Sequence, residues 1–107
     1  ITDYLSENFK NALTLTDAAA ALGYERCYFS KMFKGVFGVG FCDYINTLRF
    51  GAAARELTHT SKSITDVALD SGFQSVRSFN EVFRKKSGMT PQKYRSITQS
   101  NRKDELK

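Results

Sequence analysis

The sequence predicts an all-α fold in which one small helical unit occurs twice and a longer helix joins the two copies. Along most of the 107 residues, apolar side chains recur every three or four positions, which is the spacing of one face of an α-helix. A Ser or Thr followed three residues later by Asp, a pattern that starts helices, stands before two of these segments, and a glycine follows each of them. Caps, glycines and aromatic residues occur in the same order in both halves of the chain, and chance rarely matches all three together.

The second copy has the clearest pattern, in residues 64–95. Ser63 and Asp66 form a capping box in front of a short apolar stripe, so a short helix is expected to begin there. Gly72 then supplies the left-handed backbone that a sharp turn requires. A longer basic helix is expected over about 75–87, with Ser75 as its N-cap, and a Thr-Pro pair follows it. A short helix, a glycine turn and a longer helix are the order of a helix-turn-helix unit, whose second helix enters the major groove of DNA.

The longer helix of this copy has an apolar and a polar face, with Phe79 and Phe83 on the side that points inward. The residues of the opposite face that we expect to contact bases are Val76, Arg77, Asn80 and Glu81. The guanidinium of Arg77 can donate two hydrogen bonds to guanine, and the amide of Asn80 can pair with adenine. Two alternatives stay open: Arg77 can simply pair with Glu81 four residues on, and Asn80 can be an ordinary exposed amide. Glu81 itself can accept from cytosine or orient a neighbouring cation.

The first copy repeats this plan about fifty residues earlier. Gly23 precedes Gly72 by 49 positions (72 − 23), and Phe29 precedes Phe79 by 50 (79 − 29), because the second long helix has one extra residue at its start. A recognition helix is therefore expected over about 25–37. Its inward stripe is expected to be Phe29, Met32, Phe33 and Val36. Its outward residues, expected to contact bases, are Arg26, Cys27, Ser30 and Lys31. The two copies share core residues and differ in outward ones, as two readers of different sequences would.

The segments around the copies complete this plan. A helix over residues 41–57 is expected to link them, with Gly40 as its N-cap. The first unit then covers about residues 1–40 and the second about 63–97. Residues 98–107 are polar and mixed in charge, so a frayed polar tail is expected there.

The charge balance is basic, with 16 Lys and Arg against 11 Asp and Glu, a formal net charge of +5. Such a balance suits a polyanionic partner. The cations around the two recognition helices are expected to contact DNA phosphate, which positions a protein on the duplex without specifying sequence. These cations are Lys34, Arg84, Lys85, Lys86, Lys93 and Arg95.

The sequence offers no residue pattern for catalysis or for a metal site. Cys27 and Cys42 form no C-x-x-C pair, so two reduced thiols of a cytosolic protein are expected, and His59 is the only histidine. No serine-nucleophile, phosphate-loop or H-E-x-x-H pattern occurs. No apolar run is long enough to span a bilayer, and no secretory signal is present. The chain begins at Ile1 rather than Met, so we expect it to be part of a longer protein.

Two sets of residues resemble the C-terminal DNA-binding domain of AraC/XylS-type bacterial transcription regulators. In the first half the set is Tyr28-Phe29-Ser30-Lys31, Phe33-Lys34, Gly38, Tyr44, Arg49, Ala53 and Leu57. In the second half, which looks like the family signature, it is Ile64, Val67-Ala68, Gly72-Phe73, Phe79, Val82-Phe83-Arg84, Gly88-Met89-Thr90-Pro91 and Tyr94-Arg95. The resemblance covers residues 1–97 and departs from the family pattern at Phe50, where an aliphatic residue is common.

The resemblance implies about seven helices, with two helix-turn-helix units that read adjacent major-groove segments of double-stranded DNA. It also implies a bacterial, cytoplasmic and nucleoid-associated regulator whose effector or sensor domain lies in a missing part of the chain. No cofactor, metal, membrane partner or enzymatic activity is expected. Two alternatives stay open: a helical protein-interaction module, for example one that docks on RNA polymerase, and a non-specific nucleic-acid binder.

Overall fold

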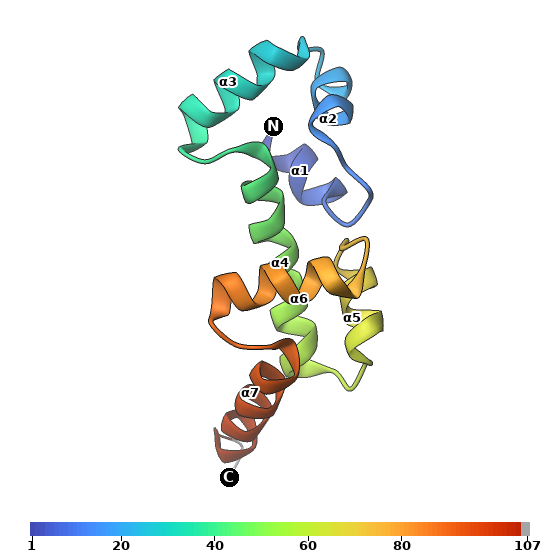
Figure 1. Ribbon diagram of the computed structural model, residues 1–107, viewed down its shortest axis with the longest axis vertical. Coiled ribbons are helices and arrows are strands. Elements are labelled where there is room, and N and C mark those ends of the chain that lie inside the picture. Colours follow the sequence, from blue (N-terminus) through green and yellow to red (C-terminus); the bar gives the residue numbers. More distant parts are fainter. Residues whose placement is uncertain (106–107) are drawn as a thin grey trace. The chain divides into compact units, whose positions relative to one another are not determined.

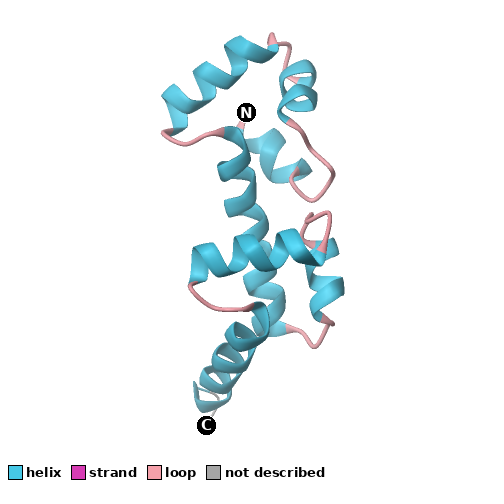
Figure 2. Ribbon diagram, viewed as in Figure 1, coloured by secondary structure: helices cyan, strands magenta, loops and turns pink. Residues whose placement is uncertain are grey.

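The computed structural model describes the backbone of residues 1–105 and the side chains of residues 1–101. Within this range it contains seven helices and no strand, which confirms the predicted all-α fold (Figure 1; Figure 2). The helices are α1 (Thr2–Asn8), α2 (Leu15–Ala21), α3 (Arg26–Phe37), α4 (Phe41–His59), α5 (Ile64–Asp70), α6 (Val76–Ser87) and α7 (Pro91–Glu105). They form two compact units, Ile1–Leu48 and the chain from Arg49 onward, so α4 begins in the first unit and ends in the second.

Hydroxyl caps begin four of these helices, α2, α5, α6 and α7. Thr14, Ser63 and Ser75 each accept a hydrogen bond from the backbone N–H three residues further on, at 3.1, 3.0 and 3.1 Å, which confirms these three predicted caps. A cap of this kind contributes about 1 kcal/mol because it satisfies an N–H that has no partner inside the helix. The turns after α2 and α5 contain Gly23 and Gly72, whose φ angles of 81° and 103° lie in the region that L side chains rarely adopt. The short helix, the turn and the longer helix are therefore fixed locally in each copy.

Aromatic side chains hold the first unit together. Phe29 and Phe33 are fully buried on the inner face of α3. The ring of Phe33 meets those of Phe41 and Tyr44 edge-on, with centroids 5.6 and 5.4 Å apart. Such pairs contribute about 0.5–1.5 kcal/mol beyond the burial of their area. This packing fixes which side of α3 remains on the surface.

One residue of α3 departs from the predicted inward stripe. Val36 is 68% exposed, so the prediction that it faces inward is wrong. Phe37 packs against Phe33 instead, with ring centroids 4.3 Å apart. Because Phe37 lies four residues after Phe33, it continues the same helix face, and Val36 is turned toward solvent.

The second unit has its own core, in which α4, α5 and α6 meet. Its buried members are Ala53, Leu57, Val67, Ala68, Phe73, Phe79 and Phe83. The ring of Phe83 contacts those of Phe50, Phe79 and Tyr94, with centroids 4.7, 5.5 and 5.1 Å apart. Full burial of a Phe side chain contributes about 1.5–3 kcal/mol, so Phe79 and Phe83 determine the inner face of α6. The aromatic ring of Phe50 is accommodated as part of this packing.

Two helices are longer than predicted. Helix α4 ends at His59, two residues beyond the expected boundary at 57 (59 − 57), and α7 continues to Glu105. The prediction of a frayed tail is therefore wrong over residues 98–105. The reason is a contact distant in sequence: Gln99 Nε2 donates to a carbonyl oxygen in the last turn of α4 at 3.0 Å. The rest of the predicted tail, residues 106–107, lies outside the described residues.

Candidate nucleic-acid interface

The outward face of α3 gathers the residues predicted to contact DNA in the first unit. All five side chains are exposed: Arg26, Cys27, Ser30, Lys31 and Lys34. The first four of them, together with Leu15 of α2, line a shallow pocket of about 290 Å³. The face offers a thiol, a hydroxyl and cationic groups within one unit. It can therefore combine hydrogen bonding with neutralisation of negative charge.

A carboxylate outside the predicted set begins this helix. Glu25 is the N-cap of α3, where Oε1 accepts from the backbone N–H of Cys27 at 3.0 Å and Oε2 accepts from that of Tyr28 at 2.8 Å. The bond from Cys27, followed by the bond from Tyr28, lowers the pKa of Glu25 from its ordinary value of 4.5, because both bonds favour the charged carboxylate. Ser, Thr, Asp and Asn are the preferred caps, so a Glu before a helix carries little signal in the sequence.

The outward face of α6 carries Arg77 and Glu81 as an exposed ion pair. Arg77 Nε donates to Glu81 Oε1 at 3.4 Å, and the two side chains are 90% and 69% exposed. The pairing considered as the alternative for Arg77 is thus present in the structure. An exposed pair at this spacing contributes only about 0.3–0.5 kcal/mol, so little free energy is needed to exchange the carboxylate for another acceptor. The guanidinium remains accessible to a ligand.

Asn80 and Arg84 of α6 lie beside the start of α7. A pocket of about 480 Å³ is lined by Ile64, Asn80, Arg84, Thr90, Pro91 and Gln92. Thr90 Oγ1 accepts from the backbone N–H of Lys93 at 3.2 Å and so caps α7. Asn80, Arg84, Lys85 and Lys93 are all exposed. The N-terminal end of a helix carries partial positive charge, so this part of the surface is favourable for an anion.

Three of the residues predicted to contact DNA are half-buried rather than exposed. Val76 is half-buried and packs against the second core. Arg95 is also half-buried, and its Nε donates to the backbone oxygen of Leu57 at 3.1 Å. Lys86 is half-buried as well. The structure thus gives Val76 and Arg95 contacts within the fold. The residues of α6 that lie on its exposed face are Arg77, Asn80, Glu81, Arg84 and Lys85.

The thiols and acidic groups form no further site within the part of the chain that is described. Cys27 and Cys42 are free and exposed. Over the same residues, no group of three or more His, Cys, Asp or Glu side chains is arranged to hold a metal ion. No helix in this range combines the length and the apolar character needed to cross a membrane.

Two transcription regulators are similar in sequence to this chain along most of its length. An uncharacterised helix-turn-helix-type transcriptional regulator of Staphylococcus aureus (strain COL) is 37% identical over 95 residues, which are 89% of this chain and 13% of the relative. The melibiose operon regulatory protein of Escherichia coli K12 is 35% identical over 99 residues, 92% of this chain and 33% of that protein. The chain thus spans about an eighth and a third of the lengths of these two relatives.

Solved structures share the arrangement of the helices. The C-terminal domain of the two-component response regulator yesN from Fusobacterium nucleatum matches with a TM-score of 0.85 and 30% identity, over 88% of this chain and 92% of that domain. The DNA-binding domain of the global transcriptional factor AdpA, solved with a target DNA, matches with a TM-score of 0.90 and 25% identity, over 94% and 91% of the two chains.

A family model described as a helix-turn-helix domain matches residues 18–97. This match includes α3, α4, α5 and α6 completely, and hence both recognition helices. Together with the named regulators and the solved domains, it places the sequence in one family. The chain belongs to the AraC/XylS-type helix-turn-helix domains, the DNA-binding domains of transcription regulators.

Proposed function

We propose that this chain reads a specific sequence of double-stranded DNA as the reader domain of a transcription regulator, with α3 and α6 in adjacent major-groove segments. The observation that carries the proposal is that each of these two helices buries two Phe side chains on one face and exposes polar residues on the other. An α-helix fits the major groove, where each base pair presents a distinct pattern of donors and acceptors.

The residues of α6 divide into two roles by their chemistry. Arg77 and Asn80 carry the planar, multiple donors and acceptors that recognise guanine and adenine edges. Arg84, Lys85 and Lys93, which lie toward the end of α6 and the start of α7, are suited to phosphate. Each phosphate contact lowers the slope of log K against log salt by about 0.9, so affinity falls steeply as salt is added.

The residues of α3 divide in the same way. Arg26, Cys27, Ser30 and Lys31 line the pocket of the first unit and are assigned to bases, whereas Lys34 is assigned to phosphate. The cysteine and serine of this face each offer few hydrogen-bonding groups. We therefore assign most of the base discrimination in the first unit to Arg26 and Lys31.

The relatives support this assignment at the level of the domain. AdpA was solved with a target DNA, and the melibiose regulatory protein is named for control of an operon. The two regulators that match in sequence are much longer than this chain, so we assign effector sensing, where it occurs, to residues outside this domain. A contact with RNA polymerase is a further proposal at that level.

Selection of bound duplexes from a random pool tests the proposal. The wild type is expected to enrich one sequence. Arg77→Ala should weaken binding to it by about 1–3 kcal/mol and relax preference at one base position. Arg55→Ala is the matched control, because it removes the same charge from an exposed site on α4.

The outcomes separate the alternatives. Enrichment by the wild type and by Arg55→Ala, with relaxed specificity in Arg77→Ala, supports base reading by α6. Equal loss on selected and scrambled duplexes would reduce Arg77 to a phosphate contact. No enrichment with the wild type would favour a non-specific binder or a protein-interaction module.

A further inference from the structure

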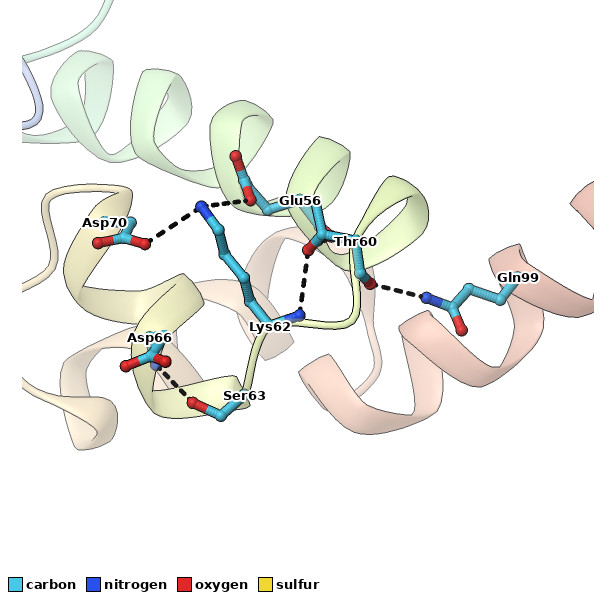
Figure 3. Close-up of polar contacts among 7 residues, drawn as sticks. All are labelled: Glu56, Thr60, Lys62, Ser63, Asp66, Asp70 and Gln99. Atoms are coloured by element: carbon cyan, nitrogen blue, oxygen red, sulfur yellow. Dashed lines mark hydrogen bonds and ion pairs between the residues drawn. The ribbon is translucent and has the colours of Figure 1, made fainter.

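The turn at residues 60–63 joins α4 to α5 and is crossed by a lysine bridge. Lys62 Nζ lies 3.1 Å from Glu56 Oε2 on α4 and 3.3 Å from Asp70 Oδ2 on α5 (Figure 3). The carboxylates of Glu56, first, and of Asp70 raise the pKa of Lys62 because both favour the charged ammonium. One side chain from the turn thereby connects the helix before it with the helix after it.

Helix α7 reaches the same turn from the far end of the sequence. Gln99 Nε2 donates to the backbone oxygens of Leu57 and Thr60, both at 3.0 Å. Arg95 Nε donates to the Leu57 oxygen as well, at 3.1 Å. The carbonyls in the last turn of a helix have no partner within it, so these side chains supply the acceptors of α4 with donors from another element.

Thr60 lies at the centre of these contacts. Its Oγ1 donates to the backbone oxygen of Glu56 at 2.7 Å and accepts from the backbone N–H of Lys62 at 3.3 Å, while its own carbonyl accepts from Gln99 (Figure 3). Ser63, at the end of the same turn, caps α5. Three helices, α4, α5 and α7, are thus tied to one short turn. We call Glu56, Thr60, Lys62, Asp70 and Gln99 the polar clasp.

The helices that the polar clasp holds are those on either side of α6 in the sequence. Helix α5 precedes α6 and α7 follows it, and both are tied to the last turns of α4. Helix α4 is in turn the segment through which the second unit is connected to the first along the chain. A shift of α5 and α7 on α4 would therefore carry α6 with it.

We propose that the polar clasp positions α6 for DNA reading, by fixing α5 and α7 on the end of α4 and so restricting the spacing of base sequence that the chain accepts. This inference rests on the proposed function. The residues assigned to it are positioning residues, because they act through α6. Loosening the clasp should weaken binding at the selected spacing and make binding less sensitive to that spacing.

The test uses two clasp variants and two matched controls. Gln99→Ala removes the amide that joins α7 to α4, and Asn101→Ala removes an amide from an exposed position of the same helix. Glu56→Gln removes one carboxylate of the lysine bridge without changing its size, and Glu7→Gln makes the same charge change in α1. Each clasp variant therefore has a control that removes the same kind of group outside the clasp.

Dissociation constants are measured on the selected duplex, on a duplex with one base pair inserted between the two reader segments, and on scrambled DNA. The loss of one such contact, whether the hydrogen bond of Gln99 to a backbone oxygen or the ion pair of Glu56, corresponds to about a three- to tenfold change in affinity. Gln99→Ala and Glu56→Gln should lose about that factor on the selected duplex but not on the inserted one. The ratio between the two constants should therefore fall by about the same factor.

A purely structural role would give a different result. Partial unfolding lowers the active fraction equally on all duplexes, so the ratio would stay at the wild-type value, and that outcome would overturn the proposal. A ratio that falls equally in Asn101→Ala and Glu7→Gln would also overturn it. Should Gln99→Ala not fold, as judged by circular dichroism, Gln99→Asn replaces it, because the shorter amide cannot keep both carbonyl contacts. A wild type that binds selected and scrambled DNA alike would instead reject the proposed function.

Discussion

Single polar side chains set the start of the helices that carry the interface. Ser75 begins α6 with a hydroxyl, whereas Glu25 begins α3 with a carboxylate that accepts two backbone N–H groups. A negative charge at this end of a helix also interacts favourably with the helix dipole. The two recognition helices thus have the same length of 12 residues but caps of different charge. Only the cap of α3 responds to pH.

Replacing Glu25 by Gln tests this pH response. Because the pKa of Glu25 is lowered in the folded state, its stabilisation is present above the unfolded value of 4.5 and is lost as the pH falls through the lower, folded value. We expect the thermal midpoint of the wild type, followed by circular dichroism, to fall further on acidification than that of Glu25→Gln.

Glu7→Gln is the control, since Glu7 lies within α1 rather than at its start. Its midpoint should follow the pH dependence of the wild type. Identical curves for the wild type and Glu25→Gln would show that the carboxylate adds nothing to the capping of α3.

At the scale of elements, each copy combines a strong local signal with an aromatic core. The hydroxyl cap and the glycine turn define the short helix, and two buried Phe residues orient the longer one. These signals act over a few residues. The cap contributes to stability even where the helix itself, like the seven residues of α5, is too short to be stable alone.

Replacing Ser63 by Ala should therefore destabilise the second unit. The loss is expected to be about 1 kcal/mol, because the backbone N–H of Asp66 loses its acceptor. Chemical denaturation followed by circular dichroism measures this as a lower midpoint. Ser61→Ala, an exposed position of the same turn, should change stability by less than about 0.5 kcal/mol. An equal effect of both substitutions would contradict the assignment of Ser63 as the cap.

The elements that could be predicted from the sequence are those fixed by neighbours along the chain. The caps at Thr14 and Ser63, the turns at Gly23 and Gly72 and the exposed face of Arg77 all follow from local spacing. The repeat supports the predicted caps and turns, because the same cap and turn residues occur at corresponding positions in both copies. The predicted ends of both recognition helices agree with the observed ends to within one residue.

The features that could not be predicted depend on contacts between distant residues. Gln99 bonds a carbonyl 42 positions earlier, and this contact extends α7 through a segment whose composition suggests fraying. Arg95 is a cation near a recognition helix, and its bond to Leu57, 38 positions away, has no signal in the local sequence. Val36 and Phe37 both fit the spacing of an inward-facing residue, so the apolar pattern alone does not show that Phe37 packs in the first core and Val36 is exposed.

At the scale of the whole molecule, two units of one design share a single helix, α4. Each unit has its own core and its own exposed recognition face, so each can in principle contact DNA by its own residues. For helix-turn-helix readers, segments on one face of the duplex lie about one helical turn apart, at roughly 10–10.5 base pairs. A protein with two such readers should therefore protect two separate segments.

Hydroxyl-radical footprinting on the selected duplex, at saturating protein, measures this directly. We expect two protected segments with centres about one turn apart on one face of the DNA. Lys31→Ala should weaken protection of one segment and Arg77→Ala that of the other. A single protected segment, or the loss of both segments from either substitution alone, would contradict the claim that α3 and α6 are two separate readers.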